Sequence, residues 1–220
     1  MKRYKIPAHE SRNEINVVNS RFIATIAPVF SVDEAKTFIG RIKSEFSNAS
    51  HNVPAYIIGH GASVTAHCND DGEPSGTAGR PALAVLQGSG MGDAAVVVTR
   101  FFGGTKLGKG GLVRAYGDAV RSVIDIASLA EKIATHTIMI TFPYSHFDRV
   151  KLLIQNYQGL TLNNEFGGDI TLTCQFPVEA FPAFQHALSE MTHGTLQAKI
   201  IKTNPDTILP IDSFLSLKED

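Results

Sequence analysis

The chain has 220 residues, 43% of them hydrophobic, and a formal net charge of −1. This length and apolar content are enough to build the cores of one or two globular domains. The sequence has no run of about 18 apolar residues, the length that a membrane-spanning helix needs. Its first ten residues, MKRYKIPAHE, lack the apolar stretch of a secretory signal. We therefore expect a soluble protein of the cytoplasm.

The charges are divided unevenly along the chain. Residues 1–135 carry 15 Lys and Arg against 12 Asp and Glu, whereas residues 136–220 carry 5 against 9. A pI near 6.7 argues against a protein that coats nucleic acid indiscriminately, because such binding needs many phosphate-neutralising contacts. Any basic site must therefore be local. Cys68 and Cys174 form no CxxC pair, so we expect both to be reduced and structural.

The first half begins with a strand predicted over 20–30 and a helix that follows it. Ser31 and Glu34 form a capping box, in which each side chain bonds to a backbone amide at the start of a helix. Apolar residues then recur at helical spacing from Ala35 to Phe46. The other elements expected in this half are a strand over 53–59, a helix over 77–87, a strand over 93–102 and a helix after the glycine-rich run 103–111.

The second half alternates between strand and helix periodicity in a regular order. Strands are expected over 135–142, 160–166, 169–176 and 196–203, and helices over 146–157 and 178–192. The resulting order, βαββαβ, is typical of the ferredoxin-like fold. The sequence therefore predicts an α+β protein with one domain over 1–134, a ferredoxin-like domain over 135–205 and a loosely held tail over 206–220.

A basic, glycine-rich segment, RFFGGTKLGKGGLVRAY, covers residues 100–116 between a predicted strand and a predicted helix. Residues 103–109 fit the GxxxxGK pattern of a phosphate-binding loop, but Gly110 stands where that loop needs Ser or Thr to bind magnesium. Exposed amides at a helix N-terminus together with nearby cations still favour anions. The alternative is a structural turn with solvated lysines. The candidate anion-binding residues are Arg100, Gly103, Gly104, Lys106, Gly108, Lys109, Gly111 and Arg114.

A second motif, DDGEPSGTAGRP, covers residues 70–81 and places three carboxylates ahead of a helix. The carboxylates could bind a metal together with His60, His67 or Cys68, but no compact ligand spacing supports this. The stronger interpretation is that Asp and Gly form turns, that Ser or Thr caps the helix, and that the acids favour its N-terminus. The acids could also pair with the basic loop and order it. The residues of interest are Asp70, Asp71, Gly72, Glu73, Ser75, Gly76, Thr77 and Arg80.

Together, the two motifs resemble the signature of the IMPACT (YigZ) family, in particular its bacterial members. The similarity runs through nearly the whole chain. It implies an N-terminal domain with the fold of ribosomal protein S5 domain 2 and a ferredoxin-like C-terminal domain. Eukaryotic members regulate translation by competing for the ribosome-associated activator of a starvation kinase. The resemblance thus implies a role at the translation machinery.

Two functional hypotheses follow from these observations. In the first, a non-catalytic translation regulator binds RNA or the ribosome through residues 100–116, with a protein of the translation machinery as a further possible partner. In the second, the loop binds a small phosphorylated or nucleotide ligand, with or without catalysis. No nucleophile lies in a GxSxG setting, and we expect no catalytic residue, metal or cofactor.

Overall fold

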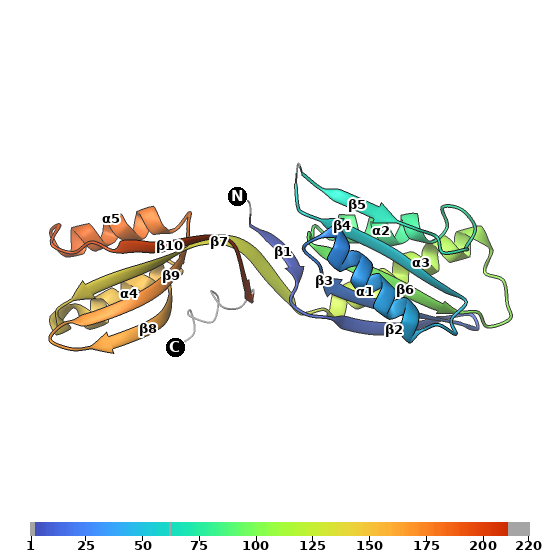
Figure 1. Cartoon of the computed structure of the whole chain (residues 1–220), viewed down its shortest axis with the longest axis horizontal. Coiled ribbons are helices and arrows are strands. Elements are labelled where there is room, and N and C mark those ends of the chain that lie inside the picture. Colours follow the sequence, from blue (N-terminus) through green and yellow to red (C-terminus); the bar gives the residue numbers. More distant parts are fainter. Residues whose placement is uncertain (1–2, 62, 211–220) are drawn as a thin grey trace. The chain divides into compact units, whose positions relative to one another are not determined.

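The computed structural model describes residues 3–61 and 63–210 of the chain (Figure 1). The chain divides into two compact units, one from Tyr4 to Ala130 and one built mainly from Glu131 onward. Helices and strands mix in both units, so the predicted α+β class with two domains is confirmed. Within the described ranges, no helix is long and apolar enough to cross a membrane.

The first unit contains a five-stranded sheet in the order β2-β3-β6-β4-β5. Every neighbouring pair in this sheet is antiparallel. A further short strand, β1 (Tyr4–Pro7), precedes it. The five strands are β2 (Ser11–Val17), β3 (Ser20–Pro28), β4 (His51–Ile58), β5 (Thr65–Cys68) and β6 (Ala94–Phe101).

Helices cover both faces of this sheet. Helix α1 (Val32–Glu45) lies on one face, and α2 (Gly79–Gly88) and α3 (Gly108–Ile126) lie on the other (Figure 1). Successive side chains of a strand point to opposite faces. Along β6, Val96 and Val98 therefore pack in the cluster of α2 and α3, whereas Ala95 and Val97 pack in the cluster of α1. Burial on both faces explains why this strand is continuously apolar.

The predicted capping box closes the start of α1. The amide of Glu34 donates to Ser31 Oγ at 3.1 Å. The carboxylate of Glu34 accepts from the amide of Phe30, one residue before the cap, at 2.9 Å. These two bonds satisfy backbone donors that a helix cannot pair internally. The helix thus starts at Val32, three residues before the first residue of the predicted apolar stripe.

The second unit has the order βαββαβ that the sequence predicts, apart from one short 3₁₀ turn at Tyr144–His146. Its strands lie in the order β10-β7-β9-β8. Both helices pack against the apolar side chains of β7 and β9. The elements are β7 (Leu129–Phe142), α4 (Phe147–Asn156), β8 (Leu160–Phe166), β9 (Ile170–Pro177), α5 (Phe181–Met191) and β10 (Lys199–Pro210).

The last strand extends beyond its predicted end, which corrects the expectation of a loose tail from residue 206. Strand β10 pairs with β7 and runs as far as Pro210. The hydroxyls of Thr135 and Thr207 lie 2.6 Å apart, and Leu209 packs with Ile133 in a small apolar cluster. These contacts hold residues 206–210 in the sheet. Residues 211–220, the rest of the predicted tail, lie outside the described residues.

Candidate nucleic-acid interface

A buried carboxylate joins the acidic motif to the strand that leads into the basic loop. Glu73 Oε1 accepts hydrogen bonds from Arg100 Nη1 at 2.6 Å and from the hydroxyl of Tyr116 at 2.8 Å. The side chains of Glu73 and Arg100 are only 3% and 6% exposed. Burial raises the pKa of Tyr116 well above its ordinary value, so its hydroxyl remains a donor. Segments from the acidic motif, β6 and α3 therefore meet at one oxygen atom.

The same arginine fixes the start of the basic loop. Ser20 Oγ accepts from Arg100 Nη2 and from the amide of Gly103, each at 3.3 Å. The guanidinium of Arg100 also lies 5.4 Å from the ring centres of Phe22 and Phe102. A Cβ atom at Gly103 would lie 1.7 Å from the carbonyl oxygen of Asn19, so only glycine fits there. Arg100 is thus part of the interior and not of an anion-binding surface.

Asp71 pairs with a lysine of α1 instead of with the basic loop. Its carboxylate accepts from Lys43 Nζ at 2.5 Å and from the amide of Asn52 at 2.7 Å. Its backbone carbonyl lies 2.8 Å from His51 Nδ1. Burial alone would raise the pKa of Asp71, but the hydrogen bonds from Lys43 and Asn52 outweigh it and lower that pKa. Asp71 therefore ties the motif to α1 and β4.

Asp70 closes the N-terminus of α2. Its carboxylate accepts from the amides of Gly76 and Gly79 at 2.8 Å and of Ala78 at 3.1 Å. Burial alone would raise the pKa of Asp70, but these three hydrogen bonds outweigh it and hold the pKa below its ordinary value. The carboxylate replaces the side-chain cap that Ala78 cannot provide. The helix is therefore capped as expected, but by Asp70 and not by the predicted Ser or Thr, since the hydroxyl of Thr77 donates to Pro74 instead.

The remaining cations of the basic segment lie on the surface. Lys106, Lys109 and Arg114 are exposed, the first in the loop and the other two in the first two turns of α3. Helix α3 has no side-chain cap at its N-terminus and no acidic residue in its first turn. Its first amides therefore keep their partial positive charge beside three full charges. This end of α3 is the most favourable place for an anion among the predicted residues.

The other predicted residues either allow tight turns of the backbone or lie at the surface. Gly72, Gly76, Gly104 and Gly108 adopt positive φ angles of 88°, 76°, 84° and 71°. A Cβ at Gly111 would lie 3.0 Å from Leu107 Cβ. The hydroxyl of Thr77 donates to the carbonyl of Pro74 at 2.6 Å, whereas Ser75 and Arg80 are exposed. Among the described residues, no group of three or more His, Cys, Asp or Glu could hold a metal ion.

Sequence reasoning missed four partners of these motifs, namely Ser20, Lys43, His51 and Asn52. They belong to three different elements, and no spacing within the motifs points to them. The sheet register provides the link, because Arg100 lies opposite His51 in β4 and opposite Phe22 in β3. A correct strand alignment would have placed His51 beside Arg100. Lys43 carried no such signal.

Comparisons with known proteins match both units. The family model of the Impact N-terminal domain covers residues 18–124, and a domain of unknown function, DUF1949, covers residues 140–195. An IMPACT family member of Haemophilus influenzae is 33% identical over 203 residues, which is 92% of this chain and 98% of that protein. YigZ of Escherichia coli is 32% identical over 92% of this chain and 100% of its own. YvyE of Bacillus subtilis is 35% identical over 85% and 86%.

Solved structures include one that aligns with nearly the whole chain. A crystal structure of a hypothetical protein is 32% identical and aligns with a TM-score of 0.60 over 92% of this chain and 98% of that chain. The structure of the two-domain translational regulator Yih1 aligns with 52% of this chain and 45% of its own. Its identity is 24% and its TM-score 0.37, which is too low to support an argument.

The buried ion pair between Glu73 and Arg100 predicts a large loss of stability when the carboxylate of Glu73 is removed. Glu73→Ala leaves the guanidinium of Arg100 buried without its counter-charge, which typically costs about 3–5 kcal/mol. Ser75→Ala, at an exposed position of the same loop, should change the free energy of unfolding by less than about 0.5 kcal/mol. Urea unfolding of both variants measures the difference. Equal stability of the two variants would contradict this role of Glu73.

The cap that Asp70 forms on α2 predicts a contribution to the free energy of unfolding that depends on pH. Because the pKa of Asp70 is lowered on folding, its carboxylate stabilises the protein above the unfolded value of about 3.9. This stabilisation is lost as the pH falls through the lower folded value. Asp70→Ala should therefore be less stable than the wild type at pH 7, by about 1 kcal/mol. The gap should shrink below about pH 4, as measured by urea unfolding across pH, and a gap independent of pH would refute this role.

Proposed function

Because the chain belongs to the IMPACT family, we propose that it is a non-catalytic regulator that binds RNA or the ribosome in the cytoplasm. The contact is the basic surface at the start of α3, formed by Lys106, Lys109, Arg114 and the first amides of that helix. The role in translation is the one that the family resemblance implies. The observation that supports the choice of surface is the combination of exposed cations with an open helix N-terminus.

The charges in this segment divide between the interior and the surface. Arg100 is neutralised by Glu73 inside the protein, so it leaves no charge for a ligand. No hydrogen bond or ion pair within the described residues engages Lys106, Lys109 or Arg114. Arg80, in the first turn of the neighbouring α2, is also exposed. Lys106, Lys109 and Arg114 therefore remain available to phosphates, whereas Arg80 lies close enough to Asp70 to help lower its pKa.

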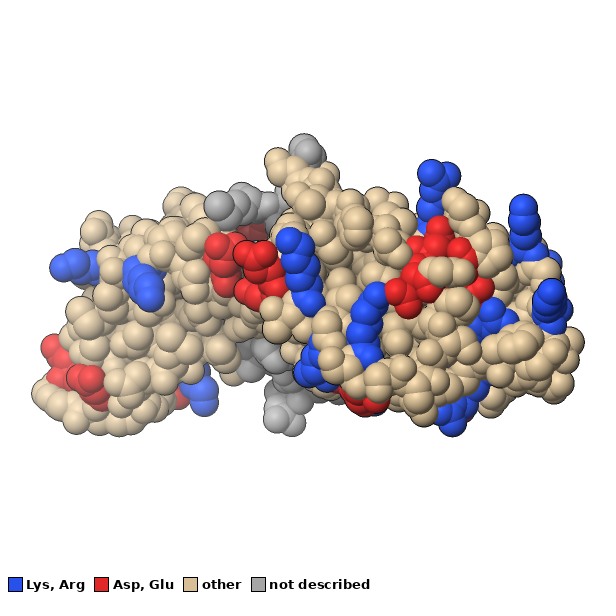
Figure 2. Space-filling view, turned by 45° about the vertical axis from the view of Figure 1, so that its right-hand side comes forward, with Lys and Arg blue, Asp and Glu red and all other residues tan. Residues whose placement is uncertain are grey.

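The basic surface at the start of α3 is confined to a few residues, because the chain as a whole is nearly neutral. On the face shown in Figure 2, Lys and Arg side chains stand among acidic ones and do not form one continuous basic area. Ion pairs also occur within the first unit, where Arg12 Nη1 of β2 pairs with Glu45 Oε1 of α1 at 2.5 Å. Cations paired in this way are neutralised within the protein and attract phosphates weakly. This pattern favours one docking surface over coating of nucleic acid along its length.

A small phosphorylated ligand is the second candidate for the same surface. The open N-terminus of α3 suits a single phosphate as well as a phosphate in a chain. Sites for small ligands, however, usually enclose most of the ligand's surface. Lys106, Lys109 and Arg114 are all exposed, so a macromolecular anion fits the observations better.

Co-sedimentation with purified ribosomes across a salt series tests this proposal. Wild-type binding should weaken as salt rises, because counterions are released from the phosphates. Replacing Lys106, Lys109 and Arg114 by alanine should reduce the slope of log affinity against log salt by about 2–3. The matched control replaces Arg149, Lys151 and Lys202, three exposed cations of α4 and β10, and should keep the wild-type slope.

Two results would contradict the proposal. Wild-type protein that fails to sediment with ribosomes even at low salt would exclude this partner. An equal loss of binding in both triple variants would show that the start of α3 has no special role. Circular dichroism of each variant confirms that the protein is folded, so that a loss of binding is not a loss of structure.

A further inference from the structure

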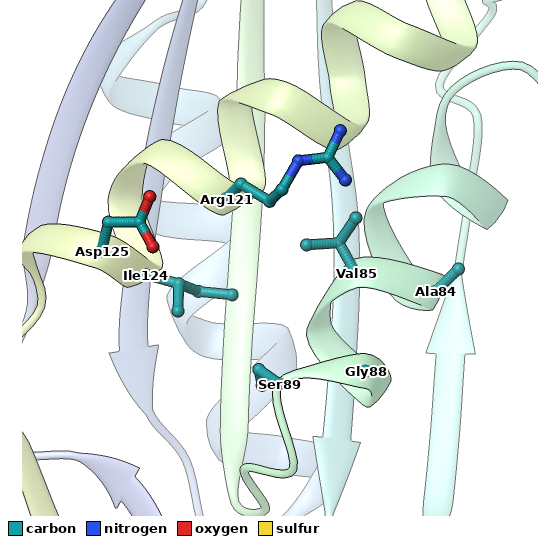
Figure 3. A pocket seen from close by; sticks show the side chains of 7 residues that line it. All are labelled: Ala84, Val85, Gly88, Ser89, Arg121, Ile124 and Asp125. Atoms are coloured by element: carbon teal, nitrogen blue, oxygen red, sulfur yellow. The ribbon is translucent and has the colours of Figure 1, made fainter.

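A groove runs between α2 and α3 on the face turned away from the sheet. Two hollows, of about 450 and 420 Å³, share the lining residues Ala84, Val85 and Arg121 and therefore form one continuous depression. One hollow reaches Pro81 and Gly110 near the starts of the two helices, and the other reaches Gly88 and Asp125 near their ends. The helices thus lie side by side and run in the same direction. Figure 3 shows the hollow of about 450 Å³, which reaches Gly88 and Asp125.

Small side chains keep this groove open. Ala84 and Gly88 on α2, together with Gly110 and Gly117 on α3, line it. A Cβ atom at Gly88 or Gly110 would have no neighbour within 4 Å, so both positions face open space. The floor is otherwise aliphatic, with Val85 pointing toward α3 in Figure 3. Such a trough can accept large apolar side chains from another molecule.

Arginines form the polar edge of the groove. Arg114 and Arg121 both line it and are seven residues apart on α3, so they lie on one side of the helix, about 10 Å apart. Arg121 extends from α3 over the gap toward α2 (Figure 3). Its 2.5 Å pair with Asp118 is exposed, with 56% and 45% of the two side chains accessible, and is therefore weak. Asp125 is the one acidic residue in the lining of the two hollows.

We propose that this groove binds an amphipathic helix of a partner protein whose apolar residues are flanked by Asp and Glu. The apolar side chains, spaced by three or four residues, occupy the aliphatic trough. The carboxylates pair with Arg114 and Arg121 at its edge. A nucleic-acid strand fits less well, because the lining contains no aromatic ring on which a base could stack. The groove shares Arg114 with the proposed RNA or ribosome contact and otherwise lies beyond it, along the length of α2 and α3.

Selection from a displayed library of random peptides tests the proposal with the full chain. Peptides of about 16 residues, roughly 24 Å long as helices, are long enough to follow the groove. We expect the selected peptides to carry large apolar residues at helical spacing together with Asp or Glu. Their affinities are then measured by fluorescence anisotropy against the wild type and three variants, Arg121→Glu, Ala84→Gln and the control Lys36→Glu.

Arg121→Glu should weaken binding of the selected peptides about tenfold, because an attraction becomes a repulsion. Ala84→Gln should weaken it by filling the trough. All three substitutions lie at exposed positions of helices, so the fold is expected to persist. Lys36→Glu makes the same charge change on α1 and should leave affinity unchanged.

Several outcomes would overturn the proposal. These are a selection without enrichment, enriched peptides that are basic, and affinities that are equal in all variants. Competition by single-stranded RNA that disappears in Ala84→Gln would assign the groove to nucleic acid instead. Neither Arg121 nor Ala84 belongs to the surface tested with ribosomes, so the peptide proposal and the ribosome proposal can fail separately.

Discussion

The first unit depends on one buried carboxylate. Glu73 Oε1 holds Arg100 of β6 and Tyr116 of α3 at the same time, although the three residues are far apart in the sequence. A buried guanidinium without a counter-charge is costly, so the loop that carries Glu73 must remain against the sheet. Ser20 then binds both Arg100 and the amide of Gly103. The position of the acidic loop and the start of the basic loop are therefore set by one network.

The two motifs use their charges in opposite ways. The three acids stabilise the interior, since Asp70 binds backbone amides, Asp71 binds Lys43 and Glu73 binds Arg100. The cations after Phe102 remain outside this network. As a result, the N-terminus of α2 is closed by a carboxylate, whereas the N-terminus of α3, on the same face of the sheet, stays open. Only the second is available to an anion from outside.

Local patterns predicted most elements because each pattern reflects a force that acts within a short segment. Helical spacing from Ala35 to Phe46 and the capping box before it located α1, and strand periodicity over 160–166 and 169–176 located β8 and β9. Strands β1, β2 and β5 were not predicted. Most of their residues are only partly buried or exposed, so hydrophobic periodicity gives little signal there.

The candidate site was only partly predictable, because its order comes from tertiary contacts. The motifs indicated which residues matter, but not that Arg100 turns inward while Lys106 and Lys109 remain exposed. That distinction follows from the burial of β6 on both faces and from the register that places His51 and Ser20 near Arg100. Charge alone in a sequence does not separate a structural cation from one that is free to bind.

We propose that the start of α3 is a preformed anion-binding surface used at the translation machinery. Electron cryomicroscopy of the protein bound to purified ribosomes at low salt would test this most directly. We expect Lys106, Lys109 and the first amides of α3 to lie within hydrogen-bond distance of ribosomal RNA phosphates. A complex in which this end of α3 faces solvent while another surface makes the contact would contradict the account.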